Sequence, residues 1–274
     1  MMRSGENGMA DEQRIVQAAQ FLCEEHRARK PFAPLPAPFV ARHVDEAYAV
    51  QEAFHSGMAA THGPVAGYKI ALTTPVMQQM VGFQEPVFGA ILARTIHQSP
   101  YTIRSADHVH VGVECEVAVR LAADLPAARA PYRRDQVAEV IGAVMAAFEL
   151  VDDRHADYAH FASQILSIIA DNAWNAGIVL GPPARDWQTV DLGAAHGTML
   201  INGAIVGEGY GRDVMGHPLD ALVWLANMLA QRGKTLSQGM IVMTGSIVAT
   251  QFVHPGDTVR FGVEALGEVH CSVA

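Results

Sequence analysis

From His108 to Val117 the chain runs His-Val-His-Val-Gly-Val-Glu-Cys-Glu-Val. Side chains of a β-strand point alternately to its two faces, so this stretch is expected to form a strand with four valines and a cysteine on one face. The opposite face carries two histidines, a glycine and two glutamates, Glu114 and Glu116. The apolar face predicts contact with a protein core, and the polar face is the first candidate for a functional site.

Glu114 and Glu116 lie about 6.6 Å apart along such a strand, because the rise is about 3.3 Å per residue. Two carboxylates on one face at this spacing repel each other, and a divalent cation between them would relieve the repulsion. Their oxygen atoms favour Mg²⁺ or Mn²⁺ over zinc. The alternative is a solvated strand face that simply carries two acidic residues. His108 and His110 lie too far along the strand to join both glutamates, and we expect them on the surface or packed against a loop.

Two further charged residues lie inside apolar segments. Glu149 belongs to Ala-Ala-Phe-Glu-Leu-Val at residues 146–151, and Lys69 to Ala-Gly-Tyr-Lys-Ile-Ala-Leu at residues 66–72. An unpaired charge in such surroundings is costly. Glu149 is therefore expected to be neutral, paired with a cation such as Arg154, or bound to a metal. Lys69 is expected either to reach solvent from an edge strand or to be desolvated, with its pKa lowered towards the range of an acid–base catalyst.

The remaining polar insertions are weaker signals. Asp171 and Asn172 follow the apolar run Ile168-Ile169-Ala170, and Thr244-Gly245-Ser246 follows another apolar segment. Each group could supply hydrogen bonds in a cleft, or could equally form a cap or a turn. The sequence contains no GxSxG, P-loop or GxGxxG motif, so it predicts neither a serine nucleophile elbow nor a phosphate-binding loop.

Composition narrows the class of protein. With 274 residues, of which 50% are apolar and 17% charged, the chain can bury a large core in one large domain or two small ones. The balance of 19 basic against 28 acidic residues gives a net charge of −9, which argues against a nucleic-acid or anionic-membrane partner. Three scattered cysteines indicate neither a disulfide framework nor a thiolate zinc site. The polar start and the short apolar runs predict a cytoplasmic protein without a membrane span.

Periodicity, caps and turn residues predict the secondary structure. Helices are expected at residues 11–30, 45–61, 75–82, 135–147 and 218–232. Strands are expected at residues 65–72, 109–121, 148–151, 197–201, 204–206, 241–244, 258–263 and 269–273. Because helices and strands mix without a regular alternation, the predicted fold class is α+β. Residues 1–10 are expected to be disordered, 11–100 to form a helical N-terminal part, and 101–274 a β-rich metal-binding part, the last two packed as one compact unit.

Seven short motifs follow one another between residues 45 and 270. They are Ala47-Tyr48-Ala49-Val50-Gln51, Gly67-Tyr68-Lys69-Ile70, Val113-Glu114-Cys115-Glu116, Glu149-Leu150-Val151-Asp152, Ala170-Asp171-Asn172-Ala173, Leu222-Val223-Trp224-Leu225-Ala226-Asn227 and Thr244-Gly245-Ser246. In this order and spacing they resemble the fumarylacetoacetate hydrolase superfamily, and within it the branch of 2-oxopent-4-enoate hydratases and 4-oxalocrotonate decarboxylases.

The resemblance implies a β-rich mixed roll, like the fumarylacetoacetase C-terminal domain, with a helical N-terminal part. It also implies a homo-oligomer that uses Mg²⁺ or Mn²⁺. The site residues that it implies are Glu114, Glu116 and Glu149 for the metal, Lys69 and Asp171 for catalysis, and Lys69, Leu72, Asn172 and Ser246 for binding the substrate.

The activity implied is that of a hydratase. It would add water to an unsaturated 2-oxo (2-hydroxydienoic) acid and give a 4-hydroxy-2-oxo acid, in the meta-cleavage catabolism of aromatic compounds. Three alternatives stay open: a 2-oxo-3-enedioate (4-oxalocrotonate) decarboxylase, a C–C bond hydrolase of the same superfamily, and an inactive subunit associated with a related pathway enzyme. They stay open because the chain departs from many hydratases in having Val87 after Pro86, where many have Asp, and in carrying no Lys at residues 160–163.

Overall fold

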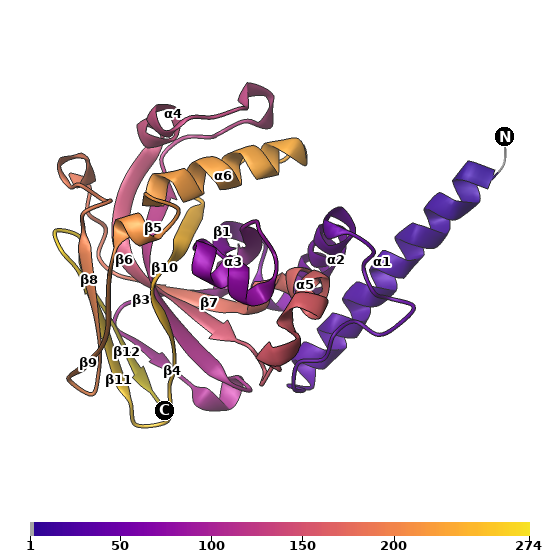
Figure 1. Cartoon of the computed structure of the whole chain (residues 1–274), viewed down its shortest axis with the longest axis horizontal. Helices are drawn as coiled ribbons and strands as arrows, with labels where there is room; N and C mark the ends of the chain where they lie inside the picture. Colours follow the sequence, from indigo (N-terminus) through magenta and orange to yellow (C-terminus); the bar gives the residue numbers. More distant parts are fainter. Residues whose placement is uncertain (1–2) are drawn as a thin grey trace.

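The computed structural model describes residues 3–274, with side chains from residue 11 onward, as two β-sheets with helices around them (Figure 1). The larger sheet has seven strands and the smaller has five. In spatial order the larger sheet contains β2 (Val87–Leu92), β1 (Val65–Ala71), β10 (Ile241–Phe252), β5 (Val111–Leu121), β6 (Ile141–Asp152), β7 (Asn175–Leu180) and β3 (Ile96–Gln98). The smaller contains β4 (Tyr101–Ile103), β12 (Gly267–Val273), β11 (Thr258–Val263), β8 (His196–Ile201) and β9 (Ala204–Tyr210).

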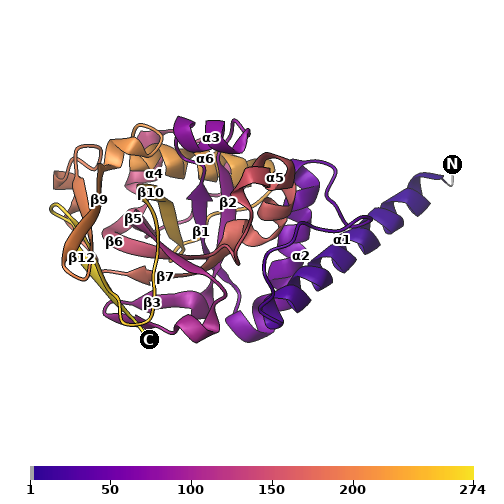
Figure 2. The ribbon, with the colours of Figure 1, turned by 60° about the horizontal axis from the view of Figure 1, so that its bottom comes forward.

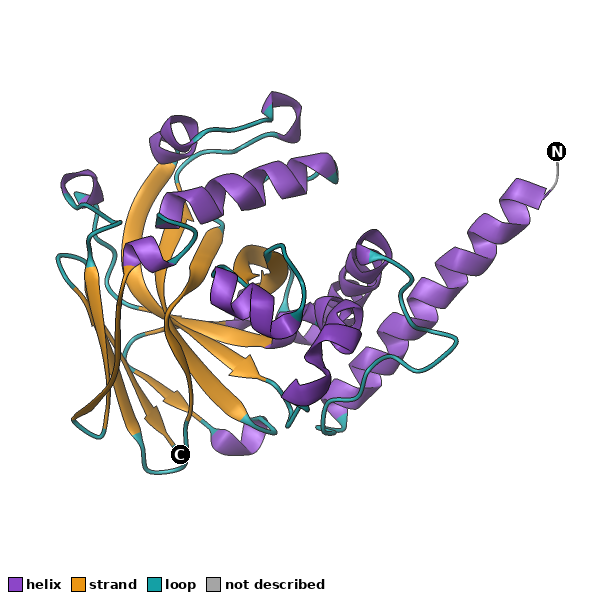
Figure 3. Ribbon diagram, viewed as in Figure 1, coloured by secondary structure: helices purple, strands orange, loops and turns teal. Residues whose placement is uncertain are grey.

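The helices lie outside the sheets. They are α1 (Arg3–Arg27), α2 (Val44–His62), α3 (Pro75–Val81), α4 (Arg134–Glu139), α5 (Phe161–Ala170) and α6 (Pro218–Gln231). Figure 2 shows α1, α2 and α5 gathered at the end of the molecule away from β9 and β12, while α3 and α6 lie along another side. The curled sheets with helices near the N-terminus confirm the α+β class and the predicted roll (Figure 3).

The core lies between the two sheets, where β11 and β12 pack on β6. Phe148 of β6 and Phe261 of β11 meet there, with ring centroids 6.2 Å apart, and both side chains are fully buried. The apolar face predicted for residues 109–117 is part of this core, since Val113, Cys115 and Val117 have no exposed surface. Burial of this face fixes the register of β5, because a slip of one residue would exchange its two faces.

Local signals in the sequence are confirmed where capping or turn residues carry them. The Thr74 side chain accepts a hydrogen bond from the Met77 amide at the start of α3, and Gly82 ends that helix in the left-handed conformation, with φ of 64°. Asn202 and Gly203, with φ of 53° and 82°, form the tight turn between β8 and β9.

The helix predicted at residues 135–147 is confirmed only as far as Glu139 and is wrong beyond it. Helix α4 ends at Glu139, and residues 141–152 form β6, which pairs with β5 on one side and β7 on the other. Both faces of β6 are buried, so its sequence is an almost continuous apolar run without the alternation of a half-exposed strand. Such a run cannot be distinguished from a buried helix by its periodicity.

The N-terminal helix begins earlier than the sequence predicts. Helix α1 includes residues 3–10, which were expected to be disordered, while Met1 and Met2 lie outside the described residues. Extending an established helix adds one hydrogen bond for each residue fixed, so the boundary is weakly marked in the sequence. None of the helices in residues 3–274 combines the length and apolar character that a membrane crossing requires.

Candidate active site

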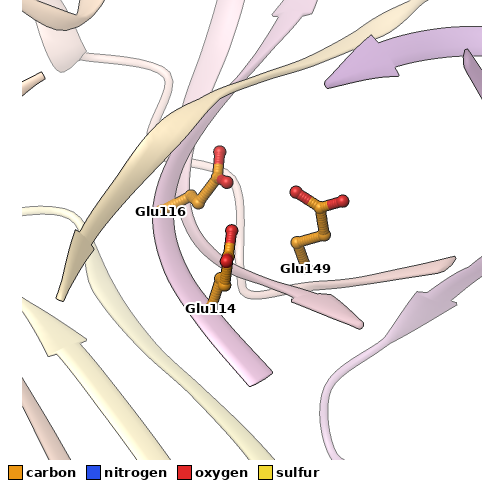
Figure 4. Close-up of side chains that lie close together, drawn as sticks. All are labelled: Glu114, Glu116 and Glu149. Carbon is orange, nitrogen blue, oxygen red and sulfur yellow. The ribbon is translucent and has the colours of Figure 1, made fainter. Parts of the chain in front are cut away.

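Three glutamates from two neighbouring strands converge on one space (Figure 4). Glu114 of β5 lies directly opposite Glu149 of β6, and Glu116 follows two residues later on the same strand as Glu114. One carboxylate oxygen from each residue can be chosen so that all three lie within 4.8 Å of one another. The alternation of β5 and its pairing with β6 therefore bring together the three residues that the sequence offers as metal ligands.

One oxygen of each carboxylate is fixed by a neighbouring donor. The donors are Thr250 Oγ1 for Glu114, the Gly245 amide for Glu116 at 2.7 Å, and Asn175 Nδ2 and Lys69 Nζ for Glu149, both at 2.9 Å. Two other oxygens, Glu116 Oε1 and Glu149 Oε2, are buried without a hydrogen-bond partner in the part of the chain that the structure describes. Donors that orient a carboxylate through one oxygen and leave the other free are the usual surroundings of a metal ligand.

The three glutamates carry more negative charge than the neighbouring protein groups balance. Burial, and after it the charges of Glu149 and Glu114, raise the pKa of Glu116 well above its ordinary value. Burial also raises the pKa of Glu149, although Lys69 opposes the change. Three oxygen ligands, two orphaned acceptors and a deficit of positive charge all fit a hard divalent cation.

Among the side chains described from residue 11 onward, Lys69 supplies the one positive charge in contact with this group. Its strand β1 lies between β2 and β10, so Lys69 is neither on an edge nor exposed, with 2% of its side chain accessible. Of the two alternatives for Lys69, the one in which it reaches solvent is therefore wrong, and Glu149 is paired with Lys69 and not with Arg154. Burial lowers the pKa of Lys69, but the nearby carboxylates, Glu149 foremost, raise it by more. Beside these carboxylates the pKa of Lys69 is therefore raised, which is the direction opposite to the expected one.

A cavity of about 340 Å³ opens beside the glutamates. Lys69, Glu114, Ser246 and Thr250 form its polar end. The other walls are mainly apolar and include Leu72, Val76, Met77, Val87, Phe161, Ile165, Ile168 and Trp174. Among the described residues that line it, Lys69 is the only one with a cationic side chain. A small molecule with one anionic end and an apolar remainder matches this distribution.

Several residues in and next to the cavity wall have a strained backbone conformation. Leu72 has φ of 57°, and the consecutive residues Asn172, Ala173 and Trp174 have φ of 58°, 45° and 60°. Non-glycine residues seldom adopt this left-handed conformation, and runs of them cluster at functional sites. Leu72, Ala173 and Trp174 line the cavity, so the strain lies in its walls.

Asp171 and Asn172 lie behind the cavity wall and are not among the residues that line it. Asp171 is fully buried; it accepts a hydrogen bond from Arg154 Nη2 and lies 2.5 Å from His26 Nε2. Asn172 binds both backbone groups of Ala90, at 2.7 and 2.9 Å, and lies 2.8 Å from His55 Nε2. These contacts tie β2 and the helices together behind the site.

Leu72 and Ser246 do line the cavity. The Ser246 hydroxyl accepts a hydrogen bond from the Cys115 amide at 3.0 Å and donates to the Val248 carbonyl at 2.6 Å. It therefore joins β5 to β10 where the pairing of these strands is irregular. The structure thus brings Lys69, Leu72, Ser246 and the three glutamates to one place, and leaves Asp171 and Asn172 one layer further out.

Sequence reasoning missed several residues of the site. Thr250 lies beyond the strand predicted at residues 241–244, in the part of β10 that runs on to Phe252, and the register shifts between Ser246 and Gln251 prevent simple alternation from placing it. Asn175 and Tyr158 carry no local signal, because their roles depend on contacts with Glu149 and Asp153. The apolar wall of α5 was also missed, since this helix was not predicted.

Comparisons with known proteins agree with this geometry. Residues 74–274 match the family described as fumarylacetoacetate (FAA) hydrolase, C-terminal. A 2-keto-4-pentenoate hydratase of Paraburkholderia phymatum is 33% identical over 267 residues, covering 96% of this chain and 99% of that protein. A 4-oxalocrotonate decarboxylase of Pseudomonas putida is 29% identical over 227 residues, covering 82% of this chain and 83% of that protein.

Among solved structures, the 4-oxalocrotonate decarboxylase from Pseudomonas putida G7, complexed with magnesium and adipate, superimposes with a TM-score of 0.88 at 26% identity. The superposition covers 96% of this chain and 98% of that one. The family match spans most of the chain, and the hydratase relative is similar over almost its whole length. The chain belongs to the fumarylacetoacetate hydrolase family.

Proposed function

We propose that this protein is a divalent-metal-dependent hydratase that converts a 2-hydroxy-2,4-dienoic acid into a 4-hydroxy-2-oxo acid, as in the catabolism of aromatic compounds after meta-cleavage. The observation that carries the proposal is the cavity itself, which has Lys69 and Glu114 at one end, with Glu116 and Glu149 clustered beside Glu114, and an apolar remainder. The relatives named 2-keto-4-pentenoate hydratase support it, because the similarity covers 96% and 94% of this chain for two of them.

Glu114, Glu116 and Glu149 would hold the metal, and Mg²⁺ or Mn²⁺ suits their oxygen ligands. When bound, such an ion stabilises negative charge that develops on the 2-oxygen of a 2-oxo acid. Thr250, Asn175 and the Gly245 amide keep the carboxylates oriented. Lys69 remains protonated beside them, so it can bind the substrate carboxylate and donate a proton at the same end of the cavity.

The far walls favour the hydratase over the decarboxylase. Decarboxylation of a 2-oxo-3-enedioate requires a cavity that accepts a second carboxylate away from the metal. Apart from Lys69, none of the described lining residues is cationic, and Asp213 adds a negative charge at the rim. A second carboxylate would therefore be desolvated without a partner, which is costly. The decarboxylase remains the second candidate because one such enzyme shares both the fold and 26% of its sequence.

The residues behind the wall have supporting roles in this proposal. Asp171 fixes Arg154, and Asn172 fixes β2, while Leu72 and Ser246 shape the cavity.

We also propose a homo-oligomer, since β9 exposes apolar side chains at Ile205 and Val206. A cytoplasmic location is supported by three cysteines that are all free.

The test is to add freshly generated 2-hydroxypenta-2,4-dienoate, or its analogue with a second carboxylate, to the protein with Mg²⁺ or with EDTA. Loss of the dienol absorbance and release of CO₂ are followed together. The hydratase predicts metal-dependent loss of absorbance without CO₂ and a preference for the monocarboxylate. Release of CO₂ from the dicarboxylate would assign the decarboxylase instead. An unchanged absorbance with both compounds would exclude both activities.

A further inference from the structure

A tyrosine at the cavity is held by a buried carboxylate outside the metal site. Tyr158 lines the cavity and is 44% exposed, so it lies where the cavity meets solvent. Its hydroxyl donates a hydrogen bond to Asp153 Oδ2 at 2.9 Å. Asp153 is 1% exposed and does not itself line the cavity. Burial, and after it the charge of Asp153, raise the pKa of Tyr158, so the phenol is protonated at neutral pH.

The other oxygen of Asp153 is held just as firmly. Asp153 Oδ1 lies 2.7 Å from His110 Nδ1 and accepts the backbone amide of His155 at 2.9 Å. The His110 ring is stacked between Phe252 and His155, with centroid distances of 4.0 and 4.3 Å. His110 thus packs against the loop that follows β6, as the sequence predicts, and it fixes the carboxylate that faces Tyr158.

The loop that carries Asp153 and Tyr158 is strained. Arg154 and His155 have φ of 49° and 60°, although neither is glycine. The carboxylates of Asp152 and Asp153 hold this turn by accepting the Arg154 and His155 amides. Side-chain hydrogen bonds thus hold a strained turn in place beside the cavity. Strained turns of this kind are common where a functional group has to be held in one position.

Hydration requires a polar group away from the metal. After the dienol becomes a 2-oxo-3-enoate, water adds at C4, two carbons beyond the 2-oxygen. Among the titratable side chains that line the cavity, Lys69 and Glu114 lie at the metal end and Asp213 is exposed at the rim. Of the described lining residues that titrate, Tyr158 is the remaining one, and it alone of the four contacts Asp153.

We infer that Tyr158 is a catalytic residue that binds the attacking water and takes up its proton, with Asp153 and His110 as positioning residues; this inference rests on the proposed hydratase function. The water oxygen forms a bond to C4, and the C3–C4 π electrons move towards the 2-oxygen to give an enolate. The water proton passes to Tyr158 Oη as the phenol proton passes to Asp153 Oδ2. Asp153 then releases a proton to solvent by way of Tyr158, and C3 takes up one proton at the metal end, so the sum is one water added.

The test uses Tyr158→Phe, which keeps the ring and removes the hydroxyl. We expect kcat for hydration of 2-hydroxypenta-2,4-dienoate to fall about 10²–10³-fold with KM unchanged within about threefold. Exchange of the C3 hydrogens of 2-oxopentanoate with D₂O, followed by NMR, should continue at the wild-type rate, because it depends only on the metal end. Tyr132→Phe is the matched control, since the Tyr132 hydroxyl donates to the Pro126 carbonyl and Tyr132 does not line the cavity.

Asp153→Asn supplies a second test. Its amide would donate to Tyr158 Oη and reverse the hydrogen bond, so we expect a loss of kcat of about 10²-fold, again with normal C3 exchange. Hydration by Tyr158→Phe within threefold of the wild type would overturn the inference. Equal loss of exchange and hydration would do the same, because it would indicate a structural role. If the wild-type protein exchanges C3 hydrogens but hydrates neither dienoate, the proposed function fails, and the inference fails with it.

Discussion

Lys69 Nζ lies 2.9 Å from Glu149 Oε1, and both side chains are buried. The pair joins β1 to β6, which are separated in the sheet by β10 and β5. One ammonium group here faces three carboxylates, so the site is balanced only in part by the protein itself. Stability of the protein should therefore depend on Lys69 and on a divalent metal together.

Lys69→Met tests this dependence. In EDTA the variant leaves the buried carboxylates without a counter-charge, so the free energy of unfolding should fall by about 3–5 kcal/mol. Saturating Mg²⁺ should recover part of the loss, because the ion supplies positive charge to the same carboxylates. Urea denaturation with EDTA and with Mg²⁺ measures both effects. Lys234→Met is the control, since the pair between Lys234 and Glu52 is partly exposed and should contribute less than about 1 kcal/mol. Equal stability of Lys69→Met and wild type in EDTA would contradict the prediction.

Glu116→Gln should change stability in opposite directions with and without metal. Without metal, removing one of three repelling acids should leave the melting temperature equal to or above that of the wild type. With Mg²⁺ or Mn²⁺, losing one ligand should weaken binding at least tenfold, so the metal-induced rise in melting temperature should shrink. Glu139→Gln, at the exposed end of α4, should behave as the wild type. An unchanged metal titration for Glu116→Gln would remove this residue from the metal site.

The cluster of three glutamates was predictable because its signals are local. Glu114 and Glu116 share one face of a strand by alternation alone, and Glu149 is conspicuous in an apolar run. The ion pair between Glu149 and Lys69 was not predictable, because the two residues are 80 positions apart in the sequence and come together only through the order of the strands in the sheet. The same holds for β6, whose apolar run has no period, and for Asp171, whose contacts with Arg154 and His26 depend on three separate elements.

His55 should make stability depend on pH. Burial lowers the pKa of His55 to about 4, although its contact with Asn172 opposes this, and the unfolded value is about 6.5. Between these values the unfolded chain binds the proton and the folded one does not, so stability falls as pH falls through this range. The contribution between pH 7 and pH 5 is about 2 kcal/mol. His55→Gln keeps a donor for Asn172 without titrating, so its unfolding free energy should decline less on acidification in urea titrations. Parallel pH profiles for the two proteins would contradict the assignment.

Asp171→Asn separates structural support from catalysis. The change leaves the buried Arg154 charge without a carboxylate, so stability should fall by about 3–5 kcal/mol. Since Asp171 does not line the cavity, kcat of the folded fraction at low temperature should stay within about tenfold of the wild type. Asp186→Asn, an exposed change, should alter neither quantity. A loss of kcat above 10²-fold with unchanged stability would instead make Asp171 a participant in the reaction.

The charge of the far wall should decide between substrates with one and two carboxylates. Met77 on α3 lines the cavity and is 38% exposed, so Met77→Lys can place an ammonium group near the distal end of a bound substrate without burying it. A charge pair of about 1 kcal/mol at such a partly exposed position corresponds to a change of about fivefold to tenfold. We therefore expect the ratio of kcat/KM for the dicarboxylated dienoate to that for 2-hydroxypenta-2,4-dienoate to rise by this factor, and to return towards the wild-type ratio in high salt.

Met80→Lys adds the same charge on the same helix at a residue that does not line the cavity, so its ratio should not change. Equal ratios for the two variants would mean that the tail of the substrate does not approach α3, and the orientation with the anionic end at Lys69 would have to be reversed.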